Sequence, residues 1–211
     1  MPPAAQTAHA RKPTPPVRRT QVERSEATVS HLVATARDLF ATKGFADTSI
    51  EDIVRAAGVT RGALYHHFEN KTELFRAVVE AEARRLSERV VAAAQHKRDP
   101  WKQVEIGALA FLDACVDPDV QRILLIDAAS VLGWAGLREI ESRSTMALLT
   151  LGIENSIREK KLRRRDPEAL TSILFGAMCE LSMVAARASD QGAALASARK
   201  ELQALLRDIA A

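Results

Sequence analysis

Residues 44–75 read GFADTSIEDIVRAAGVTRGALYHHFENKTELF, and this stretch decides the fold. Thr48 and Glu51 have the spacing of a capping box, which satisfies two unpaired backbone donors at the start of a helix. Apolar residues then recur at three- and four-residue spacings. Gly58 follows where a left-handed residue would end that helix, and Thr60 can cap a second one. Two short helices joined by a glycine turn predict a helix-turn-helix, whose second helix enters the DNA major groove.

The second helix is too polar for a segment that serves only for packing. Its outer side gathers hydrogen-bond donors opposite Leu64 and Phe68: Thr60, Arg61, Tyr65, His66 and Lys71. The alternative is a buried helical hairpin without a ligand. A hairpin of that kind would not need this concentration of donors, so the composition favours contact with nucleic acid.

The segment from Gly44 to Leu74 resembles the DNA-binding domain of the TetR family of bacterial transcriptional regulators. The matching pattern is Gly44-Phe45, Thr48, Ile53, Ala56-Ala57-Gly58-Val59, Leu64-Tyr65, His67-Phe68, Lys71 and Leu74. The rest of the chain resembles the family only in length, helicity and layout. The resemblance implies a homodimeric repressor that a small-molecule effector releases from a palindromic operator. A transcriptional activator, or an accessory DNA-binding factor of the same fold, is the alternative.

The resemblance also implies the DNA contacts, which we expect at Thr48, Thr60, Arg61, Gly62, Ala63, Tyr65, His66, His67 and Lys71. Thr48 would meet a phosphate at the start of the second helix. Arg61 is the candidate for base reading, because a guanidinium can bond guanine O6 and N7 together. Tyr65, His67 and Lys71 would contact phosphates, and His66 a base or a phosphate. No metal is expected at the adjacent histidines, because neighbours on a helix point about 100° apart.

Composition predicts an all-α protein of about nine helices. Only 4% of the 211 residues are aromatic, and no alternating Val/Ile/Thr runs occur. Residues 1–71 hold 10 Lys and Arg against 7 Asp and Glu, whereas residues 72–211 hold 20 of each kind. The whole positive excess therefore lies with the helix-turn-helix, as phosphate contact requires. We expect a helix-turn-helix domain over 23–72 and a larger ligand-binding and dimerisation domain over 73–211.

Residues 1–22 are predicted to form a disordered basic tail. They contain five prolines and almost no large apolar side chain, so they cannot bury enough surface to offset the entropy of ordering. Such a tail could reach the minor groove or the phosphates. It could equally be a solvated segment that adds little affinity. Both alternatives remain open at this point.

Helix boundaries can be predicted through the chain. The first helix should begin at Glu23 or Ser25 and end at Lys43, and the fourth should run from Lys71 to Ala94 or Lys97. Aspartate followed by proline predicts further helix starts, at positions 99–100, 117–118 and 166–167. The apolar run 123–126 predicts a buried helix. After a break at 133–136, one long helix is expected over 137–161.

The last two helices, at about 167–189 and 193–210, each carry an apolar face. By resemblance they form the dimer interface, although both faces could instead be used in the subunit's own core. An effector cavity is expected from the family between the fourth helix and those after it. Its candidate lining is Leu109, Phe111, Leu112, Cys115, Trp134, Met146 and Met178, with Glu180 or Arg138 as polar contacts. The sequence does not indicate which effector binds.

Other classes of function have little support. The sequence contains no nucleotide-binding loop, nucleophile elbow or metalloprotease motif, so an enzyme is a remote alternative and no cofactor is expected. Cys115 and Cys179 are expected to be buried, reduced thiols, with a redox switch as the alternative. The basic run at 160–165 is interpreted as a solvated turn. No apolar run of 18 residues and no signal peptide were found, so a cytoplasmic protein is expected.

Overall fold

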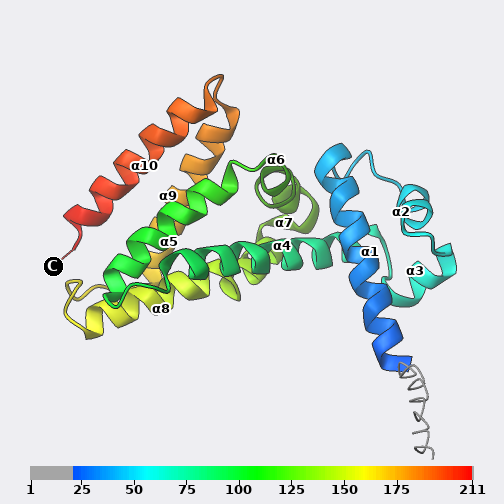
Figure 1. Cartoon of the computed structure of the whole chain (residues 1–211), viewed down its shortest axis with the longest axis horizontal. Helices are drawn as coiled ribbons and strands as arrows, with labels where there is room; N and C mark the ends of the chain where they lie inside the picture. The colour runs from blue at the N-terminus through cyan, green and yellow to red at the C-terminus, as the bar shows by residue number, and fades with distance from the viewer. Residues whose placement is uncertain (1–20, 211) are drawn as a thin grey trace, which may run out of the picture.

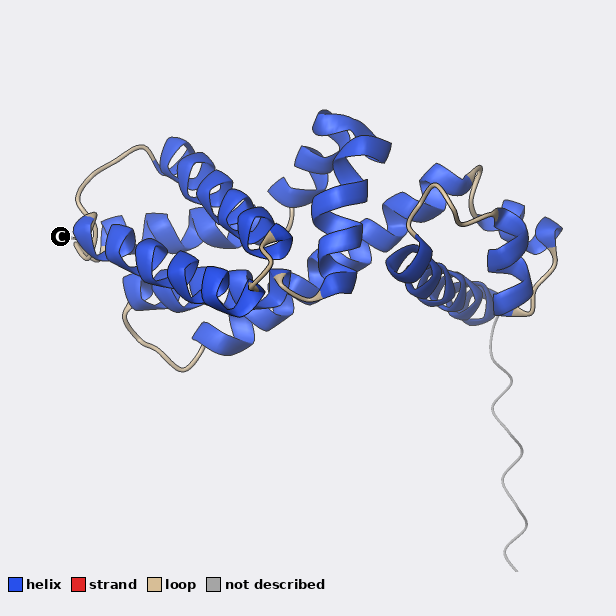
Figure 2. Ribbon diagram, turned by 90° about the horizontal axis from the view of Figure 1, so that it is seen from above, coloured by secondary structure: helices blue, strands red, loops and turns tan. Residues whose placement is uncertain are grey.

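The computed structural model describes residues 21–210, and within this range the chain is helical apart from its connections (Figures 1 and 2). Residues 1–20 lie outside the described residues, and with them most of the predicted basic tail. Gln21 and Val22, which we expected in the tail, belong to the first helix. The all-α prediction is confirmed.

The elements follow one another with short connections. They are α1 (Gln21–Lys43), α2 (Ile50–Ala57), α3 (Arg61–His67), α4 (Lys71–Ala94), α5 (Pro100–Cys115), α6 (Pro118–Val120), the π-helix η1 (Gln121–Asp127), α7 (Ala128–Ser142), α8 (Thr145–Arg158), α9 (Pro167–Arg187) and α10 (Gln191–Asp208). α6, η1 and α7 follow one another directly, and α7 is kinked at Gly133, inside the predicted break, where φ is +70°. Counted as one run, they bring the described residues to nine helical runs, as predicted.

The aspartate–proline pairs start helices as predicted. The side chains of Asp99, Asp117 and Asp166 each accept a hydrogen bond from a first-turn backbone N–H, and proline follows each of them. Proline fits there because the first helical residues have no intrahelical acceptor for their N–H.

Two local predictions are wrong. The capping box of α2 is formed by Ser49 and Asp52, one residue later than Thr48 and Glu51. The long helix expected over 137–161 is divided, because α7 ends at Ser142 and α8 begins at Thr145. At the junction the Ser144 hydroxyl donates to the carbonyl of Ile140 at 2.9 Å. Serine side chains that bond the backbone in this way compete with helix continuation.

Two apolar cores lie along α4. The first joins α1–α3 and the beginning of α4 to η1 and α7, with Phe40, Ile53, Leu64 and Phe75 at its centre. The second joins the end of α4 to α5, α8, α9 and α10. Figure 1 shows α4 passing from the helix-turn-helix end of the molecule into the C-terminal bundle. One continuous helix therefore belongs to both cores.

Polar contacts reinforce the junction between the two parts. Arg37 of α1 donates to Glu82 of α4 at 3.1 Å and to Asp119 of α6 at 2.8 Å. Glu82 is only 5% exposed, so its carboxylate depends on this pairing. The Asp127 carboxylate accepts the backbone N–H of Phe45 at 2.8 Å. The helix-turn-helix is thus fixed to the η1 region as well as to α4.

Gly44 shows how closely the two parts approach. It ends α1 with φ at +84°, and a Cβ built at this position would lie 2.0 Å from the guanidinium of Arg122. Arg122 belongs to η1, and its guanidinium donates to the Lys43 carbonyl at 3.3 Å. Glycine allows both the left-handed backbone and this contact.

By length and composition, α9 is the one helix of residues 21–210 that could cross a membrane. Its buried residues, which include Leu174, Phe175 and Met178, pack into the C-terminal core. Core helices of globular proteins pass the same test, so this is weak evidence for a membrane span.

Candidate nucleic-acid interface and ligand cavity

The turn between α2 and α3 has the geometry that the sequence predicted. Gly58 is left-handed, with φ at +64°, and its N–H returns to the carbonyls of the last turn of α2. Thr60 is the N-cap of α3, and its hydroxyl accepts the N–H of Ala63 at 3.1 Å. His31 of α1 contacts the carbonyl of Ala57 at 3.0 Å. The direction of α3 is therefore fixed by a turn and a cap.

The short helix α3 presents one face to the core and another to solvent. Leu64 is fully buried, whereas the side opposite it is exposed. Thr60, Arg61, Gly62, Tyr65 and His66 are exposed, and Ala63 and His67 are half-buried. Seven of the nine predicted DNA contacts thus lie on one small helix and its cap.

Arg61 is held in place by its neighbours on the surface. Its guanidinium donates to Glu51 of α2 at 2.6 Å and to the Tyr65 hydroxyl at 3.3 Å. The hydrogen bond to Tyr65, together with the nearby Glu51 carboxylate, raises the pKa of Arg61 further. An exposed ion pair contributes little stability in water. The guanidinium is therefore charged and available for exchange with another acceptor.

The other two predicted contacts, Thr48 and Lys71, are engaged with the protein itself. Thr48 is 1% exposed, and its hydroxyl donates to the carbonyl of Gly44 at 2.8 Å. The Lys71 ammonium donates to the carbonyls of Phe45 and Thr48, at 2.8 and 2.9 Å. It also lies 4.2 Å from the centre of the Phe45 ring. Both residues fasten the loop between α1 and α2.

The comparisons with known proteins agree with this architecture. Residues 32–78 match the family described as "Bacterial regulatory proteins, tetR family", and residues 101–209 match "Tetracyclin repressor-like, C-terminal domain". The second match spans about half of the chain. The chain belongs to the TetR family. It is a DNA-binding transcription regulator and not an enzyme.

Two relatives in this family match most of the chain, and a third matches about a third of it. The HTH-type transcriptional regulator CymR of Pseudomonas putida is 32% identical over 173 residues, which are 80% of this chain and 84% of CymR. A TetR-family transcriptional regulator from Pectobacterium atrosepticum, known from a crystal structure, is 36% identical. It covers 91% of this chain and 98% of its own, with a TM-score of 0.76. The "Probable acrEF/envCD operon repressor" of Escherichia coli K12 is 42% identical over 80 residues, which are 36% of each chain.

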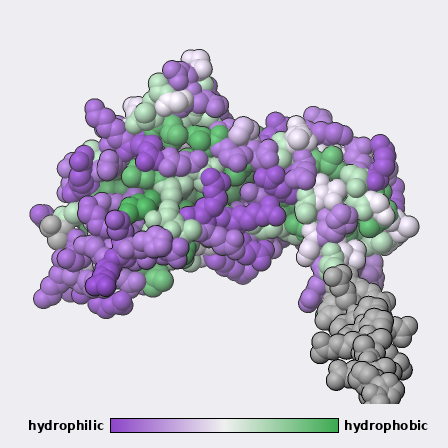
Figure 3. Space-filling model, in the orientation of Figure 1, coloured by the Kyte–Doolittle hydropathy of each residue, from purple (hydrophilic) through white to green (hydrophobic). Residues whose placement is uncertain are grey.

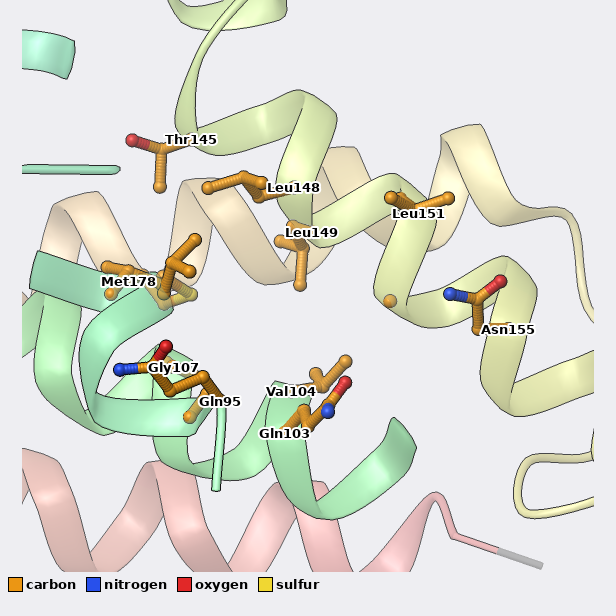
Figure 4. A pocket seen from close by; sticks show the side chains of 15 residues that line it. Gln95, Gln103, Val104, Gly107, Thr145, Leu148, Leu149, Leu151, Asn155 and Met178 are labelled. Carbon is orange, nitrogen blue, oxygen red and sulfur yellow. The ribbon is translucent and has the colours of Figure 1, made fainter. Parts of the chain in front are cut away.

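This TetR-family regulator contains a cavity of about 340 Å³ between α4, α5 and α8 (Figure 4). Fifteen residues line it, and most are apolar. Val90 and Val91 come from α4, Val104 and Ala108 from α5, and Leu149 from α8. The volume falls in the range of small-molecule sites, about 300–1,000 Å³.

The predicted lining agrees only in part with this cavity. Of the seven residues expected, Met178 lines it. Phe111 and Cys115 line a second, much smaller cavity of about 30 Å³. Leu109, Leu112, Trp134 and Met146 line neither of these two cavities. Leu112 is fully buried in the core, and Trp134 is 67% exposed.

The cavity residues that sequence reasoning missed lie mainly on the end of α4 and on α8. Neighbouring apolar residues occur there, as in Val90-Val91 and Leu148-Leu149, more than one helix face needs for a core. This excess of apolar residues was the feature of the sequence that could have indicated a cavity. Recognising it required knowing that α8 is a separate helix packed against α5.

Of the two cysteines, Cys115 is buried and Cys179 is half-buried. Burial raises the pKa of Cys115 and of Cys179 to about 12. The thiolate is the reactive form of cysteine, so both side chains are unreactive near neutral pH. This supports the interpretation as reduced structural thiols over the redox alternative.

The outer side of α9 carries apolar residues that the subunit does not cover. Ile173 is 65% exposed and Val184 is 56% exposed, and Leu205 of α10 is 42% exposed. Gly176 lies between the first two, and a Cβ there would meet no atom within 4 Å. Figure 3 shows that hydrophilic residues cover most of the face drawn, with separate apolar patches over the C-terminal bundle.

Proposed function

We propose that this protein is a homodimeric repressor that binds a palindromic operator and leaves it when a small molecule occupies the cavity. The observation that carries the proposal is the exposed polar side of α3, opposite the buried Leu64. In a helix-turn-helix the N-terminal residues of the second helix contact base edges. The relative named as an operon repressor supports the direction of regulation.

Base reading is assigned to Arg61, with Thr60, Gly62, Ala63 and His66 around it. The pairing of the Arg61 guanidinium with Glu51 and Tyr65 holds it near the start of α3. It can exchange these partners for guanine O6 and N7 on the DNA. Gly62 has only the Thr60 hydroxyl near its Cβ position, at 4.0 Å. Space on this side allows the helix backbone to approach the DNA closely.

Phosphate contacts are assigned to Tyr65, His67 and Lys71. Two of the three donors of the Lys71 ammonium already bond carbonyls, and one remains for a phosphate. The hydroxyl of Thr48 is buried and engaged, so a phosphate contact at this residue would have to use the backbone N–H. Lys71 therefore acts first as a loop anchor and second as a phosphate ligand.

Dimerisation is assigned to α9 and α10. The exposed Ile173, Val184 and Leu205 would be covered by the same helices of a second copy, because a two-fold interface pairs one patch with itself. Gly176 allows the two α9 helices to approach closely. A dimer also places two α3 helices on successive major-groove segments, which doubles the sequence read on a palindromic site.

Release is assigned to α4. Its C-terminal half lines the cavity, and its N-terminal half packs in the helix-turn-helix core and carries Glu82, the partner of Arg37. A ligand changes operator affinity only by preferring the conformation that binds DNA poorly. Movement of α4 by the ligand would change the separation of the two α3 helices. A protein that acts on the genome in this way works in the cytoplasm.

The proposal is tested by comparing Arg61→Ala with Arg55→Ala in gel-shift titrations. Arg55 lies exposed on α2 and has the same charge, so it is a matched control. Arg61→Ala should cost about 1–3 kcal/mol on the operator and relax the preference at one base pair. Arg55→Ala should weaken all duplexes alike through the salt-dependent term. Equal losses on operator and random duplex for both variants would contradict the assignment of Arg61.

A further inference from the structure

The cavity between α4, α5 and α8 carries no formal charge. None of its fifteen lining residues is Asp, Glu, Lys, Arg or His. The charged residues nearby, such as Glu80, Arg84 and Arg143, line an adjoining outer groove between α4 and α8, which shares Val91, Gln95, Leu148 and Leu151 with the cavity. An ion buried in the cavity would lose its hydration against a lining that contains no charged residue, which is unfavourable. The guanidinium of Arg158, which bonds the lining residue Asn155 at 2.6 Å, lies outside the lining itself. The cavity therefore selects neutral molecules.

Two carboxamides supply polar contacts with defined direction. The side-chain N–H of Gln103 donates to the carbonyl of Lys97 at 2.6 Å, which leaves its Oε1 as an acceptor. The Oδ1 of Asn155 accepts from the Arg158 guanidinium at 2.6 Å, which leaves its Nδ2 as a donor. A carbonyl can only accept and a guanidinium can only donate, so these partners determine the orientation of each amide.

The two carboxamides lie within one helical turn of each other along the α5–α8 pair. These helices run antiparallel, since Lys161 just beyond α8 pairs with Asp99 just before α5 at 3.6 Å. A Cβ on Gly152 would lie 2.6 Å from the side chain of Val104, so the two helices approach closely there. In this register Asn155 lies two residues beyond the position opposite Gln103, about 3 Å along the helix axis. Figure 4 shows both side chains at the end of the cavity away from Thr145 and Met178.

We propose that the cavity binds a small, uncharged, mainly apolar molecule with one hydroxyl group at its polar end, held between Gln103 and Asn155. A hydroxyl accepts from the Asn155 Nδ2–H and donates to Gln103 Oε1, so it satisfies both groups. The apolar remainder lies against Ala108, Leu148 and Leu149. The volume of about 340 Å³ is at the small end for ligand sites, about 300–1,000 Å³, and suits one ring with a short chain. This inference depends on the proposed function only where the ligand is called the effector.

Four probes of one shape test the proposal by calorimetry at pH 7: 4-pentylphenol, pentylbenzene, 4-pentylbenzoate and protonated 4-pentylbenzylamine. The phenol remains protonated at this pH, since phenolic groups titrate near pH 10. We expect the phenol to bind at least about tenfold more tightly than either ion, and more tightly than pentylbenzene, by about the value of one or two hydrogen bonds. Equal or tighter binding of either ion, or no binding of any probe, would overturn the proposal.

Substitutions of the two carboxamides test whether the hydroxyl group binds between them. Gln103→Leu and Asn155→Leu should each weaken binding of the phenol about tenfold, which is about 1.4 kcal/mol. Glu154→Leu, next to Asn155 but exposed and outside the cavity, should leave binding unchanged. Asn155→Asp keeps the shape of the side chain, so it serves if a leucine variant folds poorly. It should weaken the phenol and favour the protonated amine. Unchanged binding of the phenol in the Gln103 and Asn155 variants would refute the assignment.

Gel shifts with the same probes separate this inference from effector release. Binding of the phenol without any change in operator affinity would leave the ligand class intact and would contradict the proposed release. Release of the operator by the benzoate or the amine alone would leave regulation intact and would refute a neutral ligand. Release by the phenol, abolished in Asn155→Leu, would support both.

Discussion

The DNA-reading surface and the cavity of this protein differ in almost every physical respect. The first consists of exposed donors and positive charge on one helix of seven residues. The second is largely apolar, has no formal charge, and takes its walls from helices that are far apart in the sequence. The difference teaches that a recognition surface can be contained in one local motif, whereas a cavity exists only after the whole bundle has packed.

The junction between the two regions should give the largest effect on stability. Arg37→Met would leave the buried Glu82 with Arg85 as its remaining partner, at 3.3 Å. We expect unfolding free energy to fall by about 2–3 kcal/mol, because a buried carboxylate loses its main counter-charge. Chemical denaturation measures this loss. Arg85→Met removes an exposed partner of the same carboxylate and should cost less than about 1 kcal/mol of stability. Equal stability losses in the two variants would show that the Arg37–Glu82 pair contributes no more than an exposed ion pair.

Lys71 lies at the edge of the DNA-reading surface, and replacing it tests whether this residue mainly stabilises the fold or mainly binds phosphate. Lys71→Met removes the ammonium that bonds the carbonyls of Phe45 and Thr48. The loss should be about 2 kcal/mol of stability, because hydrogen bonds to a charged group are stronger than neutral ones. Operator affinity should fall alike for all sequences. If the unfolding free energy is unchanged and the slope of log affinity against log salt concentration falls by about one, Lys71 acts only as a phosphate contact.

Thr48 sharpens the same distinction with a smaller effect. Thr48→Val removes the hydroxyl that donates to the Gly44 carbonyl and should cost about 1 kcal/mol of stability. The salt dependence of operator binding should not change, since the hydroxyl is buried. Thr48→Ser keeps the hydroxyl and serves as the control. A reduced salt slope in Thr48→Val alone would restore the predicted side-chain contact with phosphate.

The thiols of Cys115 and Cys179, beside the second, smaller cavity, should be unreactive near neutral pH. Burial raises the pKa of Cys115 and Cys179 to about 12, whereas unfolded cysteine titrates near 8.5. The folded state therefore favours the protonated thiol. Its contribution to stability is complete below the unfolded pKa and is lost as pH rises towards 12. A thiol reagent at pH 8 should label both residues only in denaturant, and rapid labelling of the native protein would revive the redox switch.

The same contrast explains what the sequence could predict. The residues of the DNA-reading surface are close in the chain, and Gly58 ends α2 and Thr60 caps α3 at the predicted places. The position of the α2 cap was missed by one residue, because Thr48 and Ser49 are both capping residues and only the packing of α1 decides which is buried. Six of the seven predicted residues do not line the larger cavity. The break at Ser144 and the approach of α8 to α5 are tertiary features without a local signal.

Selection of bound sites from random-sequence DNA, with the mass of the complex measured on the enriched duplex, tests the central claim most directly. If two copies of α3 read the major groove, the selected DNA will be an inverted repeat. Its half-sites will be centred about 34–36 Å apart, or a multiple of this, and the complex will contain at least two protein chains. A protein that stays monomeric at micromolar concentration and enriches no sequence over random competitor would contradict it.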